Sequence, residues 1–231
     1  MLGPIFGNWT AEIPGYGPRL LAHIDLLGWE ELTRKPDAST LDRVASCQHL
    51  IEKSLRGAAV SRSQPGWSMF ESQYSDTVVF SCVPTPTEAS ALIERTRDFC
   101  AMLLYEGLHL TRGGIALGNA RHDAGAVFGP AVIEAYRLEK TAAYPRILVS
   151  DGAAPLLAGA TRDDFDGLRF LDIFQSGYSG LEWGRSIRTA VEAELARTRD
   201  LAKYSDPATA LNHRAKYGWV LRHIDAFLAE E

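Results

Sequence analysis

Features that would mark the chain as secreted, membrane-spanning or nucleic-acid-binding are scarce. Only three of its 231 residues are cysteines, and none of their spacings is that of a metal knuckle, so we expect reduced core thiols. No run reaches the roughly 20 apolar residues of a membrane-spanning helix. The first residues lack the basic and apolar segments of a signal peptide. The net charge of −5 disfavours a nucleic-acid partner, which usually leaves a basic footprint. These absences predict a cytoplasmic protein with no membrane contact.

The chain also lacks internal repeats, low-complexity tracts and charge blocks, so nothing in it marks a linker between domains. Its hydrophobic fraction of 46% is ordinary for a protein with a packed core, which excludes wholesale disorder. We therefore predict a single domain over residues 1–231, with a core at about 18–150 and a helical C-terminal extension at about 151–231.

Glycine and proline divide the chain into short segments whose periodicity predicts the secondary structure. A bounded apolar run predicts a strand buried on both faces at residues 20–27. Further strands are expected at 67–73 and 77–83 (a hairpin), at 108–117 with a break at Gly113 and Gly114, at 126–128 and at 146–150. Helices are expected at 39–57, 86–105, 130–141, 182–203 and 207–229. This order predicts an α/β (α+β) fold, a ferredoxin-like sandwich with a central, mainly antiparallel sheet and helices packed on it.

Two acids interrupt apolar β segments. Asp25 lies within the first run, directly after Ile24, and Asp76 opens the second strand of the hairpin. Burying an ionised carboxylate costs several kcal/mol unless a cation or hydrogen bonds compensate. If the first strand lies beside the hairpin, the two carboxylates meet and form a site for Mg²⁺ or Mn²⁺, which favour oxygen ligands. The alternative is that each acid only caps the turn beside it.

The segment after Asp25 offers backbone groups to an anion. Leu26, Leu27, Gly28 and Trp29 follow directly, and their N–H groups at a strand-to-helix turn are suited to cradle a triphosphate. Gly28 allows close approach of the backbone to a ligand, although an ordinary turn glycine would look the same.

Four segments in this order resemble the class III nucleotidyl cyclases. They are residues 24–29 (IDLLGW), the first metal-binding strand; 74–76 (YSD), the second metal acid at a hairpin tip; 112–118 (RGGIALG), the Arg-x-Gly-Ile strand; and 128–139 (FGPAVIEAYRLE), the helix after it. The combination of RGGI at 112–115, AYRLEK at 135–140 and YPRI at 144–147 is closest to the compact bacterial pyrimidine cyclases of the Pycsar anti-phage systems.

The resemblance implies a catalytic role for each matching residue. Asp25 and Asp76, with the Leu26 carbonyl, would hold two Mn²⁺ or Mg²⁺ ions. Arg137 would stabilise the charge that develops on the phosphoryl group, and it would come from the partner subunit of a homodimer with shared active sites. Arg112 would bind phosphate, or else it only forms an ion pair with a surface acid.

The resemblance to class III cyclases also has implications for the base of the substrate and for the biological role of the product. The family usually has an asparagine where this chain has Ile133, and its adenine-selecting members have a lysine where this chain has Ser72. The missing lysine disfavours ATP, and Tyr74 or Phe70 would contact a smaller pyrimidine. The substrate implied is UTP, with CTP next, and the cyclic product would be a second messenger read by a separate effector protein in anti-phage defence.

Two other functions stay open at this stage. Because Ile133 removes a ribose-orienting contact, the chain would also suit a catalytically inactive cyclase-like module that binds a nucleotide or a partner protein. A purine cyclase acting on ATP or GTP is the other alternative. Two histidines are given structural roles: His23 as a hydrogen-bonded neighbour of Asp25 or the sheet, and His122 as a loop residue.

Overall fold

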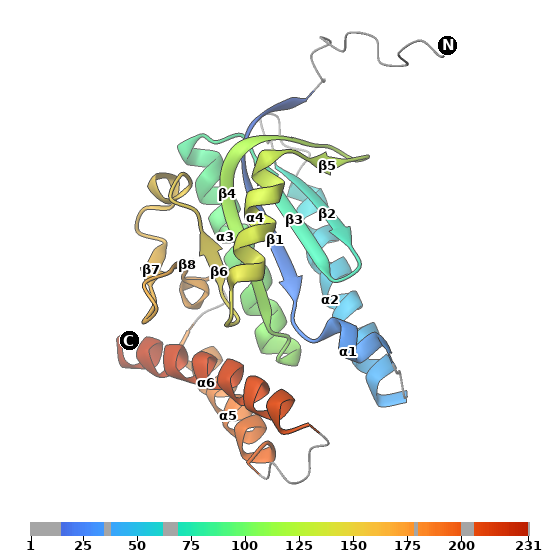
Figure 1. Cartoon of the computed structure of the whole chain (residues 1–231), viewed down its shortest axis with the longest axis vertical. Coiled ribbons are helices and arrows are strands. Elements are labelled where there is room, and N and C mark those ends of the chain that lie inside the picture. Colours follow the sequence, from blue (N-terminus) through green and yellow to red (C-terminus); the bar gives the residue numbers. More distant parts are fainter. Residues whose placement is uncertain (1–14, 35–37, 62–68, 178–179, 200–205, 231) are drawn as a thin grey trace, which may run out of the picture.

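The structure is a computed structural model that describes residues 15–34, 38–61, 69–177, 180–199 and 206–230 (Figure 1). One sheet forms its centre, with strand order β2-β3-β1-β4-β6-β8-β7 and β5 paired to β4. The eight strands are β1 (Tyr16–Leu26), β2 (Phe70–Tyr74), β3 (Thr77–Cys82), β4 (Thr111–His122), β5 (Val127–Phe128), β6 (Ile147–Val149), β7 (Thr161–Asp163) and β8 (Arg169–Leu171). Only β4 and β6 run parallel among these pairs, so the predicted, mainly antiparallel sheet is confirmed.

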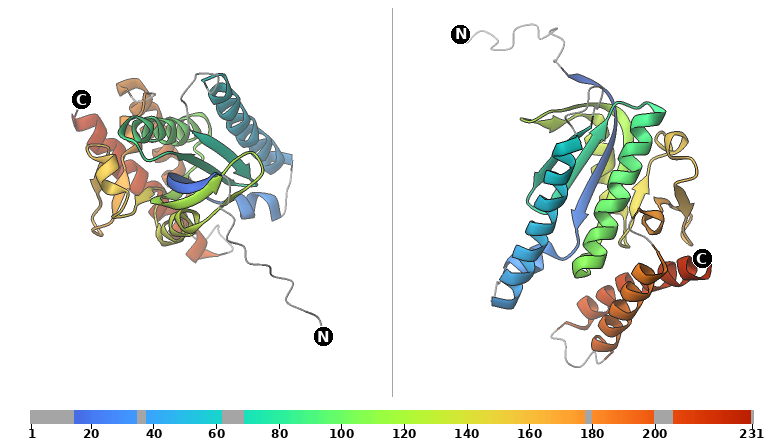
Figure 2. Two further views of the ribbon diagram at one scale, coloured as in Figure 1. Left: turned by 90° about the horizontal axis from the view of Figure 1, so that it is seen from above. Right: turned by 180° about the vertical axis from the view of Figure 1, so that it is seen from behind.

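Helices cover both faces of the sheet. They are α1 (Trp29–Arg34), α2 (Ala38–Ser61), α3 (Pro86–Gly107), α4 (Pro130–Thr141), α5 (Leu181–Arg197) and α6 (Pro207–Glu230), with short 3-10 turns η1 (Ala154–Leu157) and η2 (Ile173–Gln175). Helices α2 and α3 lie on one face, α4 lies on the other, and α5 and α6 form an antiparallel pair at one end (Figures 1 and 2). None of the described helices is long and apolar enough to cross a membrane.

The central strand β1 is buried on both faces, as its apolar run predicts. Leu20, Ala22 and Ile24 belong to the large core under α2 and α3, which includes the edge-to-face pair of Phe80 and Phe99. The alternate residues face α4, where Leu21 joins a small cluster of valine and alanine side chains. Each β1 residue therefore faces either the main core or the α4 face, and Asp25 shares the α4 face with Leu21.

Helix α4 packs unusually close to β4 because the strand presents glycines to it. A Cβ atom added at Gly114 would lie 2.3 Å from the carbonyl oxygen of Ala135, and one added at Gly118 would lie 3.4 Å from the backbone nitrogen of Ala131. The expected break at Gly113 and Gly114 is therefore wrong: β4 runs through both residues, and the glycines permit contact instead of ending the strand.

Other boundaries differ from the sequence-based expectations. Helix α3 continues through Gly107, and the left-handed residue that caps it is Leu108, with φ 51°. Strands β7 and β8 were not expected, and they continue the sheet beyond residue 150, so the C-terminal part is not only helical. Trp67, expected in the first hairpin strand, lies outside the described residues.

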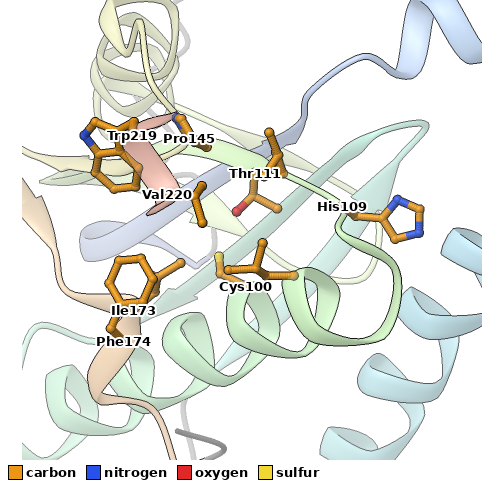
Figure 3. A pocket seen from close by; sticks show the side chains of 10 residues that line it. Cys100, His109, Thr111, Pro145, Ile173, Phe174, Trp219 and Val220 are labelled. Atoms are coloured by element: carbon orange, nitrogen blue, oxygen red, sulfur yellow. The ribbon is translucent and has the colours of Figure 1, made fainter. Parts of the chain in front are cut away.

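The C-terminal helix α6 is fastened to the sheet by a buried polar group. Arg146 is 1% exposed and forms ion pairs with Asp164 and Asp166, and the indole nitrogen of Trp219 donates to Asp164 at 2.6 Å. Trp219 and its neighbour Val220 also line an apolar hollow against α3 and η2 (Figure 3). Thr111 of β4 also lines this hollow. Because successive residues of a strand point to opposite faces of the sheet, the next residue, Arg112, lies on the other face.

Candidate functional site

The two predicted metal acids come together at one end of the central strands. Strand β1 pairs with β3 in a register that places Asp25 opposite Thr77, and the amide of Leu26 donates to the carbonyl of Asp76 at 3.1 Å. Asp76 lies in the turn that precedes β3 and is half-buried, whereas Asp25 is 9% exposed. Antiparallel pairing therefore joins two acids that are far apart in the sequence.

Asp25 lies in an environment that opposes its negative charge. Burial raises the pKa of the Asp25 carboxyl, the nearby carboxylates of Glu139 and Asp76 raise it further, and Arg112 counteracts them. The Nε atom of Arg112 donates a hydrogen bond to Asp25 Oδ2 at 3.0 Å. Arg112 is opposite Asp25 in the β1–β4 register, so this ion pair crosses between neighbouring strands. Arg112 thus forms ion pairs with two buried acids, Asp25 and Glu139, so the expectation of a surface acid as its partner is wrong.

Glu139 of α4 is the site residue that the sequence analysis missed. Its side chain is fully buried, and its Oε1 atom lies 2.7 Å from Arg112 Nε. Lys140 lies 3.2 Å from the same carboxylate on the more exposed side. The available signal was the spacing of four residues from Ala131 to Ala135 to Glu139, which puts an acid on the buried face of the helix.

The turn after β1 divides the four predicted phosphate-binding residues into two groups. The amides of Leu26 and Leu27 donate to the carbonyls of Asp76 and Leu110, so both are used within the sheet. Gly28 has φ +84°, a left-handed conformation that explains the glycine. Trp29 begins α1 and is largely buried. Within the described residues, the amides of Gly28 and Trp29 donate no hydrogen bond. Of the four amides predicted to bind phosphate, only these two are therefore not used by other described residues.

A polar network lies at the other end of the same face. Ser81 Oγ accepts from Arg19 Nε at 2.8 Å and contacts His122 Nδ1 at 2.8 Å, while His122 Nε2 contacts Ser72. Arg19 also lies over the ring of Phe70, with 5.1 Å to its centroid. His122 is therefore not a loop residue: it is the buried last residue of β4.

The remaining predicted residues lie at the surface. Tyr74, at the end of β2, is 49% exposed beside the turn residue Ser75. Arg137 is exposed on α4, and its side chain forms no hydrogen bond or ion pair within the described part of the chain. Ile133 is exposed one helical turn before it.

The expected hydrogen bond of His23 is absent: its buried Nδ1 has no partner among the described residues, and its ring meets that of Tyr136 edge-on.

The donors at the Asp25 end fit a hard divalent cation that shares its coordination with a ligand. Among the described residues, no group of three or more histidine, cysteine, aspartate or glutamate side chains is arranged to hold a metal ion. Mg²⁺, however, is usually bound by one or two carboxylates together with substrate phosphates and water. Asp25 and Asp76 supply such a pair, and the mutual repulsion of the acids favours a cation between them.

Comparisons with known proteins agree on the fold. No family model matches the sequence, and no curated protein matches it. Among solved structures, the catalytic core of a rhodopsin-guanylyl cyclase with converted specificity, in complex with ATPαS, has a TM-score of 0.50 and 16% identity, covering 68% of this chain and 96% of that chain. The monomeric guanylyl cyclase domain of the RhoGC fusion protein from the aquatic fungus Blastocladiella emersonii has a TM-score of 0.51 and 16% identity, covering 68% and 95%. The chain thus has the fold of nucleotidyl cyclase catalytic domains.

Proposed function

We propose that this protein is a nucleotidyl cyclase that converts a pyrimidine ribonucleoside triphosphate, UTP before CTP, into its 3′,5′-cyclic monophosphate and pyrophosphate. The observation that carries the proposal is the meeting of Asp25 and Asp76 at the end of the central strands of a cyclase fold. Both acids lie in segments that resemble the metal-binding segments of class III cyclases.

The residues at this end of the sheet would bind the triphosphate and its cations. Asp25, Asp76 and the Leu26 carbonyl would hold two Mn²⁺ or Mg²⁺ ions, which lower the pKa of the ribose 3′-hydroxyl and neutralise phosphate charge. The amides of Gly28 and Trp29 would donate to phosphate oxygens. In the reaction the 3′-hydroxyl would lose its proton to water, the 3′-oxygen would bond to the α-phosphorus, and the bond from that phosphorus to the bridging oxygen would break, so that pyrophosphate leaves.

A second copy of the chain would complete each site. Arg137 is exposed on α4 and forms no ion pair with an acid among the described residues of its own chain, as expected of a residue donated to a partner. Exposed apolar side chains surround the α4 face: Phe70 and Tyr74 from β2, and Ile133 and Tyr136 from α4. A homodimer that buries this surface would bring Arg137 to the partner's phosphates, where a fixed guanidinium stabilises developing charge.

The proposed choice of a pyrimidine rests on the hairpin. Ser72, at the position of the adenine-selecting lysine, contacts His122 in a partly buried network and offers no cation to a purine. Tyr74 is exposed beside it and can stack on a base or donate a hydrogen bond to its edge. The solved cyclases named above are described as guanylyl cyclases, one of them with converted specificity, so a purine substrate is the competing hypothesis.

The cyclic product would serve as a second messenger in bacterial anti-phage defence, read by a separate effector protein. This part of the proposal rests on the resemblance of residues 112–115, 135–140 and 144–147 to the Pycsar pyrimidine cyclases. A catalytically inactive nucleotide-binding module is the other competing hypothesis, and the exposed Ile133 at the usual asparagine position is the observation that favours it.

The test is a parallel assay with the four ribonucleoside triphosphates and Mn²⁺. We expect cyclic UMP as the main product, less cyclic CMP, and loss of activity in Asp25→Asn and in Asp76→Asn. A purine product as the main one would replace the pyrimidine assignment. Binding of nucleotide without any product, alongside an active cyclase as control, would identify the inactive module. Activity that survives either substitution would contradict the assignment of the two acids.

A further inference from the structure

Arg112 lies between two carboxylates that compete for one of its hydrogens. Its Nε atom is 3.0 Å from Asp25 Oδ2 and 2.7 Å from Glu139 Oε1. Nε carries a single hydrogen, and in this structure that hydrogen is donated to Asp25. Glu139 is therefore close enough to accept that hydrogen bond if Asp25 gives it up.

The position of Glu139 follows from the contact between α4 and β4. Ala131 lies over Gly118 and Ala135 lies over Gly114. Helix and strand run in opposite directions along this contact, so the next inward position of the helix, residue 139, lies over Arg112. The other two buried positions of α4 are alanines, and a buried carboxylate at the third costs several kcal/mol unless it is paired.

A divalent cation on Asp25 changes the balance at Arg112. Without a cation, Arg112 is the counter-ion of Asp25. A cation takes the oxygen lone pairs of Asp25 and repels the guanidinium, which then needs another acceptor in a region where its side chain is only 26% exposed. Glu139 is the acceptor within hydrogen-bond distance.

We propose that Glu139 is a positioning residue that receives Arg112 when a divalent cation binds Asp25. Arg112 and the cation compete for Asp25, and Glu139 relieves this competition by holding the guanidinium beside the site. This inference rests on the proposed function, because the cation is the one proposed for catalysis.

The test measures Mn²⁺ binding to the full-length protein without nucleotide, by calorimetry and by loss of the electron paramagnetic resonance signal of free Mn²⁺. Glu139→Gln keeps the shape of the side chain and removes its charge, and we expect the Mn²⁺ dissociation constant to rise at least about tenfold. The matched control is Glu71→Gln, since Glu71 also pairs through a nearly buried carboxylate with an arginine, Arg95, but on the opposite face of the sheet. We expect the control to bind Mn²⁺ like the wild type. Wild-type binding in Glu139→Gln overturns the proposal.

Two further variants separate positioning from a simple charge effect. Arg112→Gln removes the competitor, so it should bind Mn²⁺ more tightly than the wild type, and it keeps the proposal testable if Glu139→Gln does not fold. In the Arg112→Gln background, Glu139→Gln should change Mn²⁺ affinity less than it does in the wild type. Binding that is not tightened by Arg112→Gln, or an undiminished effect of Glu139→Gln in the double variant, overturns the proposal.

Catalysis adds a readout that a purely structural role would not change. In Glu139→Gln we expect the Mn²⁺ concentration for half-maximal activity to rise, while kcat at saturating Mn²⁺ stays close to that of the wild type. A loss of kcat at saturating Mn²⁺ with unchanged metal dependence contradicts the proposal. If no triphosphate is cyclised, the proposed function fails, whereas the Mn²⁺-binding comparison still decides the role of Glu139.

Discussion

At the scale of single residues, the site is a balance of charges around Asp25. Its carboxylate is buried and lies near the carboxylates of Glu139 and Asp76, and one guanidinium, that of Arg112, offsets part of this repulsion. This repulsion lowers the stability of the folded protein when no cation is bound, and it favours the binding of a cation. Stability of the empty site and affinity for the metal are therefore expected to change in opposite directions when Asp25 is replaced.

This opposition predicts how Asp25→Asn affects stability. The pKa of Asp25 is raised above its ordinary 3.8, chiefly by burial, so the folded protein binds a proton more readily than the unfolded chain. The free energy of unfolding then falls as pH rises from about 3.8 through the raised pKa, and above it the cost of the charge is fully present. Without metal at pH 7–8, Asp25→Asn should have a higher Tm than the wild type, and this gain should shrink toward pH 4.

The measurement is a series of thermal melts between pH 4 and pH 8, with a chelator or with Mn²⁺. Added Mn²⁺ should raise the Tm of the wild type and leave that of Asp25→Asn nearly unchanged. Because Arg112 keeps Glu139 as a partner, the variant leaves no guanidinium unpaired. A wild-type Tm that exceeds the variant's at pH 8 in chelator would contradict the prediction.

At the scale of elements, the contact between α4 and β4 determines where Glu139 and Arg137 lie. Gly114 lets Ala135 approach the strand, and this approach places Glu139 over Arg112. The same contact orients the opposite side of α4, with Arg137, toward solvent. The glycines of β4 thus position residues on both sides of the helix.

Two substitutions in the same strand test this contact. Gly114→Ala puts a methyl group 2.3 Å from the Ala135 carbonyl and 2.5 Å from Leu138 Cβ, so α4 must shift, and we expect a loss of stability of about 1–3 kcal/mol. Gly118→Ala is the matched control, because its nearest neighbour would be 3.4 Å away. Urea unfolding measures both, and the prediction is wrong if the two variants lose equal stability.

The same elements show how far the sequence predicts the structure. An acid inside an apolar run is visible without a structure, and pairing β1 with a hairpin strand was enough to bring Asp25 near Asp76. Glu139 stands at helical spacing from Ala131 and Ala135, but this spacing identifies a buried acid only once it is known that Gly114 brings that side of α4 against the sheet. Gly113 and Gly114 were predicted to break the strand, because the pattern of a single sequence does not show which element packs against them. Strands β7 and β8 have three residues each, too few to show a periodicity.

At the scale of the whole molecule, the proposed active site divides between two copies. Asp25 lies at the end of β1 and Asp76 lies beside β3, whereas Arg137 is exposed on the side of α4 that is not packed on the sheet. The aromatic surface of Phe70, Tyr74 and Tyr136 lies on the same face of the sheet and is exposed in the single chain. A chain acting alone would keep Arg137 away from its own acids.

Mixing two inactive variants tests this division. Asp25→Asn keeps Arg137 but loses a metal ligand, and Arg137→Ala keeps both acids but loses the guanidinium, so each variant alone should show little activity. In a one-to-one mixture with free exchange of subunits, half of the dimers combine the two variants, and each such dimer has one intact site. Activity should therefore return to about one quarter of the wild-type value per subunit. An arginine that acts within its own chain predicts no recovery, because every chain in the mixture then lacks either the acid or the arginine. Native mass spectrometry of the mixture, with one variant carrying a mass tag, establishes that mixed dimers form, so that failure to recover activity then counts against Arg137 donation and not against exchange.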